Sequence, residues 1–152
     1  MRQGGKAMAT RIRRAAVAVA LALLIAMALA GVAYAATFVG TAGEDYFGGT
    51  PNEDTAYGLG GGDYLVGAGA ADDLYGGRGW DDLIGGFGPD YIVGGQGQDE
   101  HYGNPGNDRI EAADGQRDIV DCGPGSFDRA SVDEEDEVER CEIVNGEQVA
   151  AQ

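Results

Sequence analysis

A nine-residue repeat runs without a gap from residue 40 to residue 111 of this 152-residue chain. Every unit begins with glycine and carries aspartate at its sixth position, and most units carry a second glycine at the fourth. Because units of a fixed short period bury their apolar side chains by stacking on their neighbours, this repeat constrains the fold more than any other feature. The eight units are 40–48, 49–57, 58–66, 67–75, 76–84, 85–93, 94–102 and 103–111.

Each unit has a turn-forming part and a strand-forming part. Its first six residues are rich in glycine, which supplies the positive φ angles of turns. Its last three, such as Tyr64-Leu65-Val66, favour a strand, and alternation directs the eighth position to one face. We predict an all-β fold, a parallel β-roll or β-helix in which two units make one coil of 18 residues. The inward side chains are Phe47, Ala56, Leu65, Leu74, Leu83, Ile92, His101 and Ile110.

The repeats resemble the RTX (repeats-in-toxin) nonapeptide G-G-x-G-x-D-x-U-x of calcium-binding β-rolls. The resemblance implies that calcium lies between turns one coil apart, bound by sixth-position aspartates and by carbonyls of the glycine-rich positions. Three gaps on each side of the roll imply about six calcium ions. The expected carboxylates are Asp45, Asp63, Asp81 and Asp99 on one side and Asp54, Asp72, Asp90 and Asp108 on the other. The expected glycine ligands are Gly58, Gly60, Gly76, Gly79, Gly85, Gly88, Gly94 and Gly97.

The residue chemistry also favours calcium. We expect the aspartates to line the outside of the coil, where rows of carboxylates and turn carbonyls suit a hard cation with 6–8 oxygen ligands. The repeats contain no cysteine and one histidine, which disfavours thiolate or imidazole clusters for softer metals. The inward side chains form a thin core, so we expect calcium binding to drive folding. Ala70 in a turn that needs positive φ predicts that the site between Asp54 and Asp72 is the weakest.

The N-terminal region predicts export. Basic residues in 1–14, an apolar run over 15–30 and Ala33-Tyr34-Ala35 are typical of a Sec-type signal peptide, residues 1–35, cleaved after Ala35. The alternative is an uncleaved anchor, but the apolar run is shorter than the ~20 residues of a spanning helix. The secreted chain would keep five basic residues against 26 acidic ones, a net charge of −21. Nucleic acid and membrane surfaces are therefore poor partners, and calcium ions are good ones.

The repeat register slips after Ile110. The segment 112–144 resembles the terminal module of small secreted RTX-like proteins, and we predict that it caps the β-roll. Cys122 and Cys141 are expected to pair in an exported chain. We assign the β-roll to residues 36–111 and a flexible tail to 145–152.

One part of the cap has two interpretations. Ser131 with Glu134 fits a helix capping box, whereas Val132 and Val138 fit a strand equally well. The sequence leaves the two open.

Some residues have competing interpretations. A hydrated acidic linker is disfavoured by the unbroken register. His101 is a candidate metal ligand, but its inward position favours a local defect or an exposed end. The pairs Asp72-Asp73 and Asp81-Asp82 resemble the acids of a hydrolase, but their second members fall on an outer position. Packing along the strands is favoured over an exposed carbohydrate-binding ladder for the aromatic residues Trp80, Tyr64, Tyr75, Tyr91 and Tyr102.

These features predict a secreted calcium-binding module that folds as it binds, with no catalytic site. Two alternatives remain. One is an extracellular adhesin, matrix or carbohydrate-contact module. The other is a non-catalytic accessory to a secreted hydrolase or toxin.

Overall fold

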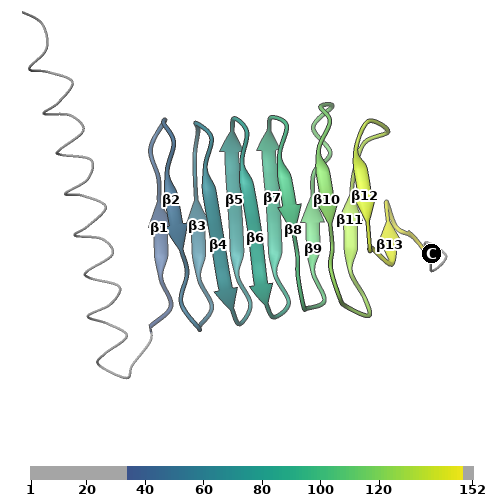
Figure 1. The fold of residues 1–152 in the computed structure, drawn as a ribbon, viewed down its shortest axis with the longest axis horizontal. Coiled ribbons are helices and arrows are strands. Elements are labelled where there is room, and N and C mark those ends of the chain that lie inside the picture. The colour runs from purple at the N-terminus through teal and green to yellow at the C-terminus, as the bar shows by residue number, and fades with distance from the viewer. Residues whose placement is uncertain (1–33, 149–152) are drawn as a thin grey trace, which may run out of the picture. The chain divides into compact units, whose positions relative to one another are not determined.

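The structure is a computed structural model that describes residues 34–148. The described residues form an all-β fold without a helix (Figure 1). All but the last two residues of the predicted signal peptide, 1–35, lie outside the described part. Within that part no helix has the length and hydropathy needed to cross a membrane.

From the first strand to the thirteenth, the strands alternate between two sheets of parallel strands, as expected when two repeat units make one coil (Figure 1). The larger sheet contains, in order, β1 (Thr37–Val39), β3 (Thr55–Tyr57), β5 (Asp73–Arg78), β7 (Tyr91–Gln96), β9 (Arg109–Glu111), β11 (Arg129–Ser131), β13 (Ile143–Val144) and β14 (Glu147–Gln148). The smaller contains β2 (Tyr46–Gly48), β4 (Tyr64–Gly69), β6 (Asp82–Phe87), β8 (Glu100–Tyr102), β10 (Ile119–Asp121) and β12 (Glu137–Glu139).

The register between strands confirms the predicted parallel β-roll. Leu65 of β4 lies opposite Leu83 of β6, and Leu74 of β5 lies opposite Ile92 of β7. Each of these partners is one coil of 18 residues further along the chain. Equivalent positions of successive coils therefore stack directly on one another.

The core is a narrow file of eighth-position side chains between the two sheets. Leu65, Leu83 and Ile92 are fully buried, as is Val120 in the C-terminal region. His101 is fully buried as well, so the expectation that it marks an exposed end is wrong. Because each coil adds two such side chains, the core is long but only one residue thick.

The coil continues through the region expected to cap it. Strand β10 pairs with β8, and β11 pairs with β9, although these turns contain one or two extra residues. The disulfide between Cys122 and Cys141 is present as predicted, and both cysteines are buried. The extra turn residues therefore absorb the slip in the repeat, and the disulfide holds the last coils together.

The C-terminal segments are extended. Ser131 ends β11 and Val138 lies in β12, so the strand interpretation of this region holds and the helix capping box does not form. Within the expected tail, Glu147–Gln148 pairs antiparallel with β13.

Candidate metal-binding rows of aspartate

The sixth-position aspartates stack in two rows, one at each set of turns. In each row the backbone N–H of one aspartate donates to Oδ1 of the aspartate one coil later, at 2.7–2.9 Å. The first row contains Asp45, Asp63, Asp81, Asp99, Asp118 and Asp136. The second row contains Asp54, Asp72, Asp90, Asp108 and Asp128 and ends on Glu142.

Sequence reasoning placed the eight repeat aspartates correctly in two sets but missed the C-terminal members of both rows. Asp118 and Asp128 follow Gly115 and Gly125 by three residues, one more than the repeat requires in the same place. Each precedes a short strand, β10 or β11. Asp118 and Asp128 can be identified in the sequence because each immediately precedes a short strand-forming segment, not because each lies at a fixed distance from a glycine.

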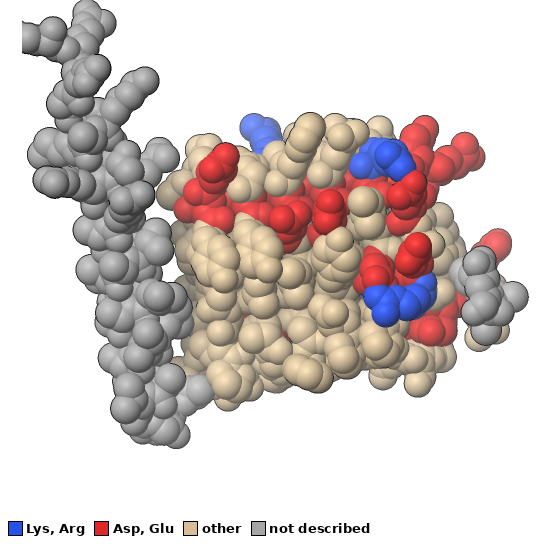
Figure 2. All heavy atoms as spheres, viewed as in Figure 1, with Lys and Arg blue, Asp and Glu red and all other residues tan. Residues whose placement is uncertain are grey.

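The row carboxylates are buried, so the expectation that they line the outside of the coil is wrong. Between Asp54 and Asp128 the side chains of both rows are at most 2% exposed. The reason lies in strand alternation: the sixth and eighth positions have the same parity and point to the same, inner face. Acidic side chains that do reach the surface gather in a band across the face seen in Figure 2.

Each buried carboxylate has one satisfied oxygen and one unsatisfied oxygen. Oδ1 accepts the backbone bond described above, while the partner oxygen, Oδ2, has no hydrogen-bond donor at eight positions. A buried anionic oxygen without a donor is costly unless a cation neutralises it. The eight residues are Asp63, Asp72, Asp81, Asp90, Asp99, Asp108, Asp118 and Asp128.

Burial dominates the proton affinity of these carboxylates. Burial is the largest cause, and together with the charges of neighbouring row carboxylates it raises the pKa of Asp90 and of Asp99 to about 7. The pKa of Asp81 rises to about 6 for the same reasons. Backbone N–H donors lower these values but do not offset the loss of water. Without metal, these three carboxylates therefore hold protons more tightly than a free aspartate, and a bound cation would displace those protons.

The first carboxylate of each row is satisfied by a threonine instead. The Thr41 hydroxyl donates to Oδ2 of Asp45 at 3.0 Å, and the Thr41 amide donates to the same oxygen. Thr50 donates to both oxygens of Asp54, with its hydroxyl 3.0 Å from Oδ1 and its amide bonded to Oδ2. Neutral donors therefore satisfy the first carboxylate of each row, whereas the later carboxylates lack a donor for Oδ2.

First-position glycines give the carboxylates their space. A Cβ on Gly58 would overlap Oδ2 of Asp63 and lie 2.6 Å from the carbonyl oxygen of Gly76. Equivalent Cβ atoms on Gly76, Gly85 and Gly94 would meet their own unit's aspartate in the same way. Glycine at this position therefore keeps open a small space bordered by a carboxylate and backbone carbonyls.

Fourth-position residues shape the turns. Gly79 and Gly88 have φ angles of 130° and 121°, and Gly97 has 158°. In the unit that starts at Gly58 the fourth-position residue is Gly61, with φ 115°. Ala70 occupies this position at φ 76°.

Replacing Ala70 with glycine should stabilise the calcium-loaded protein by about 1 kcal/mol, because alanine is strained at positive φ. Thermal unfolding monitored by circular dichroism measures the change. Ala71→Gly, one residue further and outside the positive-φ set, should be neutral or destabilising. Equal effects of the two substitutions would show that Ala70 is not strained.

The paired acids and the aromatic residues singled out in the sequence differ in their exposure. Asp73 and Asp82 are exposed, which agrees with a solvated outer position. The aromatic residues divide: Tyr57 and Tyr75 stack along the sheet at 4.9 Å between ring centroids, whereas Trp80 is 72% exposed. Packing therefore explains this tyrosine pair but not Trp80.

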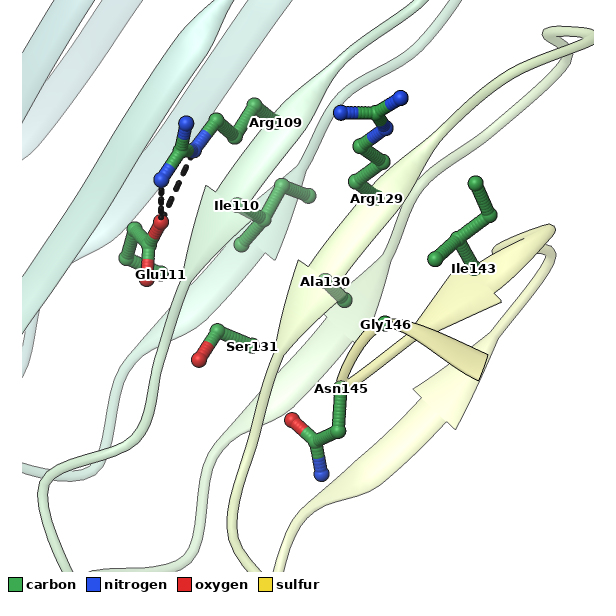
Figure 3. Close-up of a pocket in the computed structure, with 9 residues that line it drawn as sticks. All are labelled: Arg109, Ile110, Glu111, Arg129, Ala130, Ser131, Ile143, Asn145 and Gly146. Atoms are coloured by element: carbon green, nitrogen blue, oxygen red, sulfur yellow. Dashed lines mark hydrogen bonds and ion pairs between the residues drawn. The ribbon is translucent and has the colours of Figure 1, made fainter. Parts of the chain in front are cut away.

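A surface pocket lies over the C-terminal end of the larger sheet, on β9, β11 and β13 (Figure 3). Arg109 in its wall is paired with Glu111 at 2.7 Å. None of the expected site residues borders this pocket. The aspartate rows are therefore the stronger candidate site.

The fold and its two rows define a class of protein: a parallel β-solenoid of nine-residue repeats with aspartate-rich turns. The family model of the RTX calcium-binding nonapeptide repeat (4 copies) matches residues 48–79 and residues 75–110. The matched residues are thus similar to the repeats of this calcium-binding family, in agreement with the resemblance seen in the sequence. Comparisons with curated proteins and with solved structures gave no match.

Proposed function

We propose that this chain is a secreted, non-catalytic calcium-binding protein that folds as calcium enters its two aspartate rows. The observation that carries the proposal is the set of eight buried Oδ2 atoms without hydrogen-bond donors. Their repeated spacing calls for a repeated cation, and calcium accepts carboxylate and carbonyl oxygens in flexible geometry. Export would bring the chain into a calcium-rich medium in which it could complete its fold.

The residues that would hold calcium follow from the rows. Sixth-position carboxylates would supply charge from two successive coils, and the turn carbonyls around first-position glycines would add neutral oxygens. The six gaps between repeat aspartates account for about six ions. Asp118 and Asp128 extend the rows and would raise the number to about eight, one for each unsatisfied oxygen.

Native mass spectrometry of the calcium-loaded protein tests this proposal. We expect about six to eight calcium ions per chain, because the rows repeat the same oxygen donors at each coil. Magnesium, which demands tighter octahedral geometry, should give fewer bound ions. Binding of no calcium, or of a single ion, would contradict the proposal.

The metal-free fold should lose stability as pH rises. The pKa values of Asp81, Asp90 and Asp99 lie between about 6 and 7 when folded, well above the ordinary value of 3.8. Between about pH 4 and pH 7 the folded chain therefore binds more protons than the unfolded chain, and its free energy of unfolding falls with pH. Circular dichroism in chelator should show more β structure at about pH 5 than at about pH 8.

Calcium binding should respond in the opposite direction, because calcium requires ionised carboxylates. The calcium concentration at half-saturation should rise as pH falls below about 7. A metal-free protein whose β signal increased with pH would show that the carboxylates are not buried as described.

A further inference from the structure

The inward position of β8 holds a histidine whose two ring nitrogens have different surroundings. His101 is fully buried, whereas its register partners in β6 and β10 are Leu83 and Val120. Its Nδ1 lies 3.3 Å from the carbonyl oxygen of Ile119. A carbonyl oxygen only accepts, so Nδ1 carries a hydrogen and donates it. In the neutral ring Nε2 is then left with a lone pair, and it has no hydrogen-bond partner.

The unpartnered Nε2 faces the first row of aspartates. A Cβ placed on Gly94 would lie 2.6 Å from Oδ2 of Asp99 and would also overlap Nε2 of His101, so both atoms border one small space. Asp118, the next member of the row, lies beside them. One ligand atom from each of Asp99, His101 and Asp118 lies within 4.8 Å of the others.

These three groups present acceptors to one another without a hydrogen between them. Oδ2 of Asp99 and Oδ2 of Asp118 are buried and unsatisfied, as is Nε2. Acceptors gathered in a buried space repel unless a cation lies between them. Along the rest of the rows, within residues 34–148, the inward neighbours are apolar, so only this gap combines carboxylates with an imidazole.

The nitrogen donor changes the class of cation that fits. Calcium prefers oxygen ligands alone, whereas imidazole suits zinc and other divalent transition metals. A histidine that binds metal usually donates its other N–H to a carbonyl or carboxylate, as Nδ1 of His101 does to Ile119.

We propose that Nε2 of His101 and the carboxylates of Asp99 and Asp118 bind a divalent transition metal such as Zn²⁺. One imidazole with two carboxylates supplies three protein ligands, a number found in open zinc sites. The single histidine of the repeats disfavours a cluster of imidazoles, but one imidazole can still bind a metal together with carboxylates. This gap is one of the eight positions counted above for calcium, so zinc would take the place of one calcium ion, and its binding can be measured separately.

The rival occupant is a proton. A protonated Nε2 would donate to Oδ2 of Asp99, and the pair would then need no metal. The two cases differ in the protonation of Nε2, because a metal-bound Nε2 carries no hydrogen. His101 is the only histidine of the chain, so its ring signals are unambiguous in an untagged protein.

The test uses the full, untagged protein in millimolar calcium, with Zn²⁺ as the added metal. Calorimetry should show one zinc ion bound per chain. Nitrogen-15 NMR of the single imidazole should show Nε2 shifting on zinc addition while Nδ1 remains protonated. Absence of zinc binding, or an Nε2 signal that zinc does not move, would overturn the proposal.

Two variants separate coordination from folding. His101→Leu places in β8 the residue that fills the same position of β6, and Asp118→Asn keeps the Oδ1 acceptor while removing the charge. Each should weaken zinc binding at least about tenfold, since even outer-shell partners contribute that much. The β signal in calcium should persist in His101→Leu. Unchanged zinc affinity in His101→Leu would overturn the proposal, and the wild-type NMR result decides the question if this variant does not fold.

Calcium binding is read in the same samples. Zinc binding by a chain that takes up no calcium would contradict the proposed function and support this site. Calcium binding without zinc binding would do the reverse.

Discussion

Replacing Asp81 with asparagine should raise the calcium concentration needed for folding by roughly 10- to 100-fold, equivalent to about 1.5–3 kcal/mol. Asp81 lies in the middle of the first row, where its Oδ1 accepts from Asp63 and its N–H donates to Asp99. Asparagine keeps an acceptor for Asp63 but removes the charge and the unsatisfied Oδ2. Because this carboxylate borders two gaps, one substitution should weaken two calcium positions and the local fold together.

Asp82→Asn is the matched control. It removes the same charge one residue away, but Asp82 is exposed at the seventh position and belongs to neither row. Calcium titrations followed by circular dichroism should leave its midpoint close to that of the wild type. Native mass spectrometry should show two fewer ions in Asp81→Asn at limiting calcium. Equal behaviour of the two variants would mean that net charge, rather than the row, governs calcium binding.

Replacing Gly79 with alanine should destabilise the calcium-loaded protein by about 2–5 kcal/mol. Gly79 has a φ angle of 130°, which strains any residue with a Cβ. The added Cβ would also overlap the backbone carbonyl oxygen of Gly61 in the preceding coil. Since backbone must move to relieve this overlap, the damage should extend to the stacking of two coils.

Gly60→Ala is the control in the same group of turns. The nearest atom to its added Cβ is the carbonyl oxygen of Arg78 at 3.6 Å, and its φ is not positive. Its unfolding temperature should match the wild type or exceed it slightly. If Gly79→Ala unfolds at the same temperature as Gly60→Ala, the fourth-position residues of successive coils do not stack as closely as described.

The parallel fold and the division of the eight repeat aspartates into two rows were predictable because the repeat is short and unbroken. With a strand at the end of every unit, Leu65 and Leu83 must occupy equivalent places in successive coils. The same periodicity assigns alternate aspartates, such as Asp63 and Asp72, to opposite rows. Resemblance to the RTX nonapeptide then predicted calcium, and the matching family model agrees.

The direction of the carboxylates was mispredicted although the pattern contained it. If the eighth position faces inward, alternation makes the sixth position face inward too, so Asp81 and Leu83 share a side. The negative charge of the aspartates favoured a prediction of surface exposure. Backbone N–H donors and the space beside the first-position glycines make their burial possible. Burial of His101 follows from the same parity.

The C-terminal coils could not be derived from the repeat. One extra residue before Asp118 and another before Asp128 break the count, although the chain compensates within its turns. The length of a turn depends on local packing, so a fixed repeat period does not predict it. The disulfide between Cys122 and Cys141 was predictable only from the expectation of export.

The central claim is that calcium and the fold form together, and far-UV circular dichroism during a calcium titration tests it most directly. The purified protein, first treated with chelator at about pH 8, should show little β structure because its buried carboxylates are ionised and unpaired. Added calcium should restore the β signal cooperatively, and renewed chelation should remove it. A complete β signal in chelator, unchanged by calcium, would contradict the account.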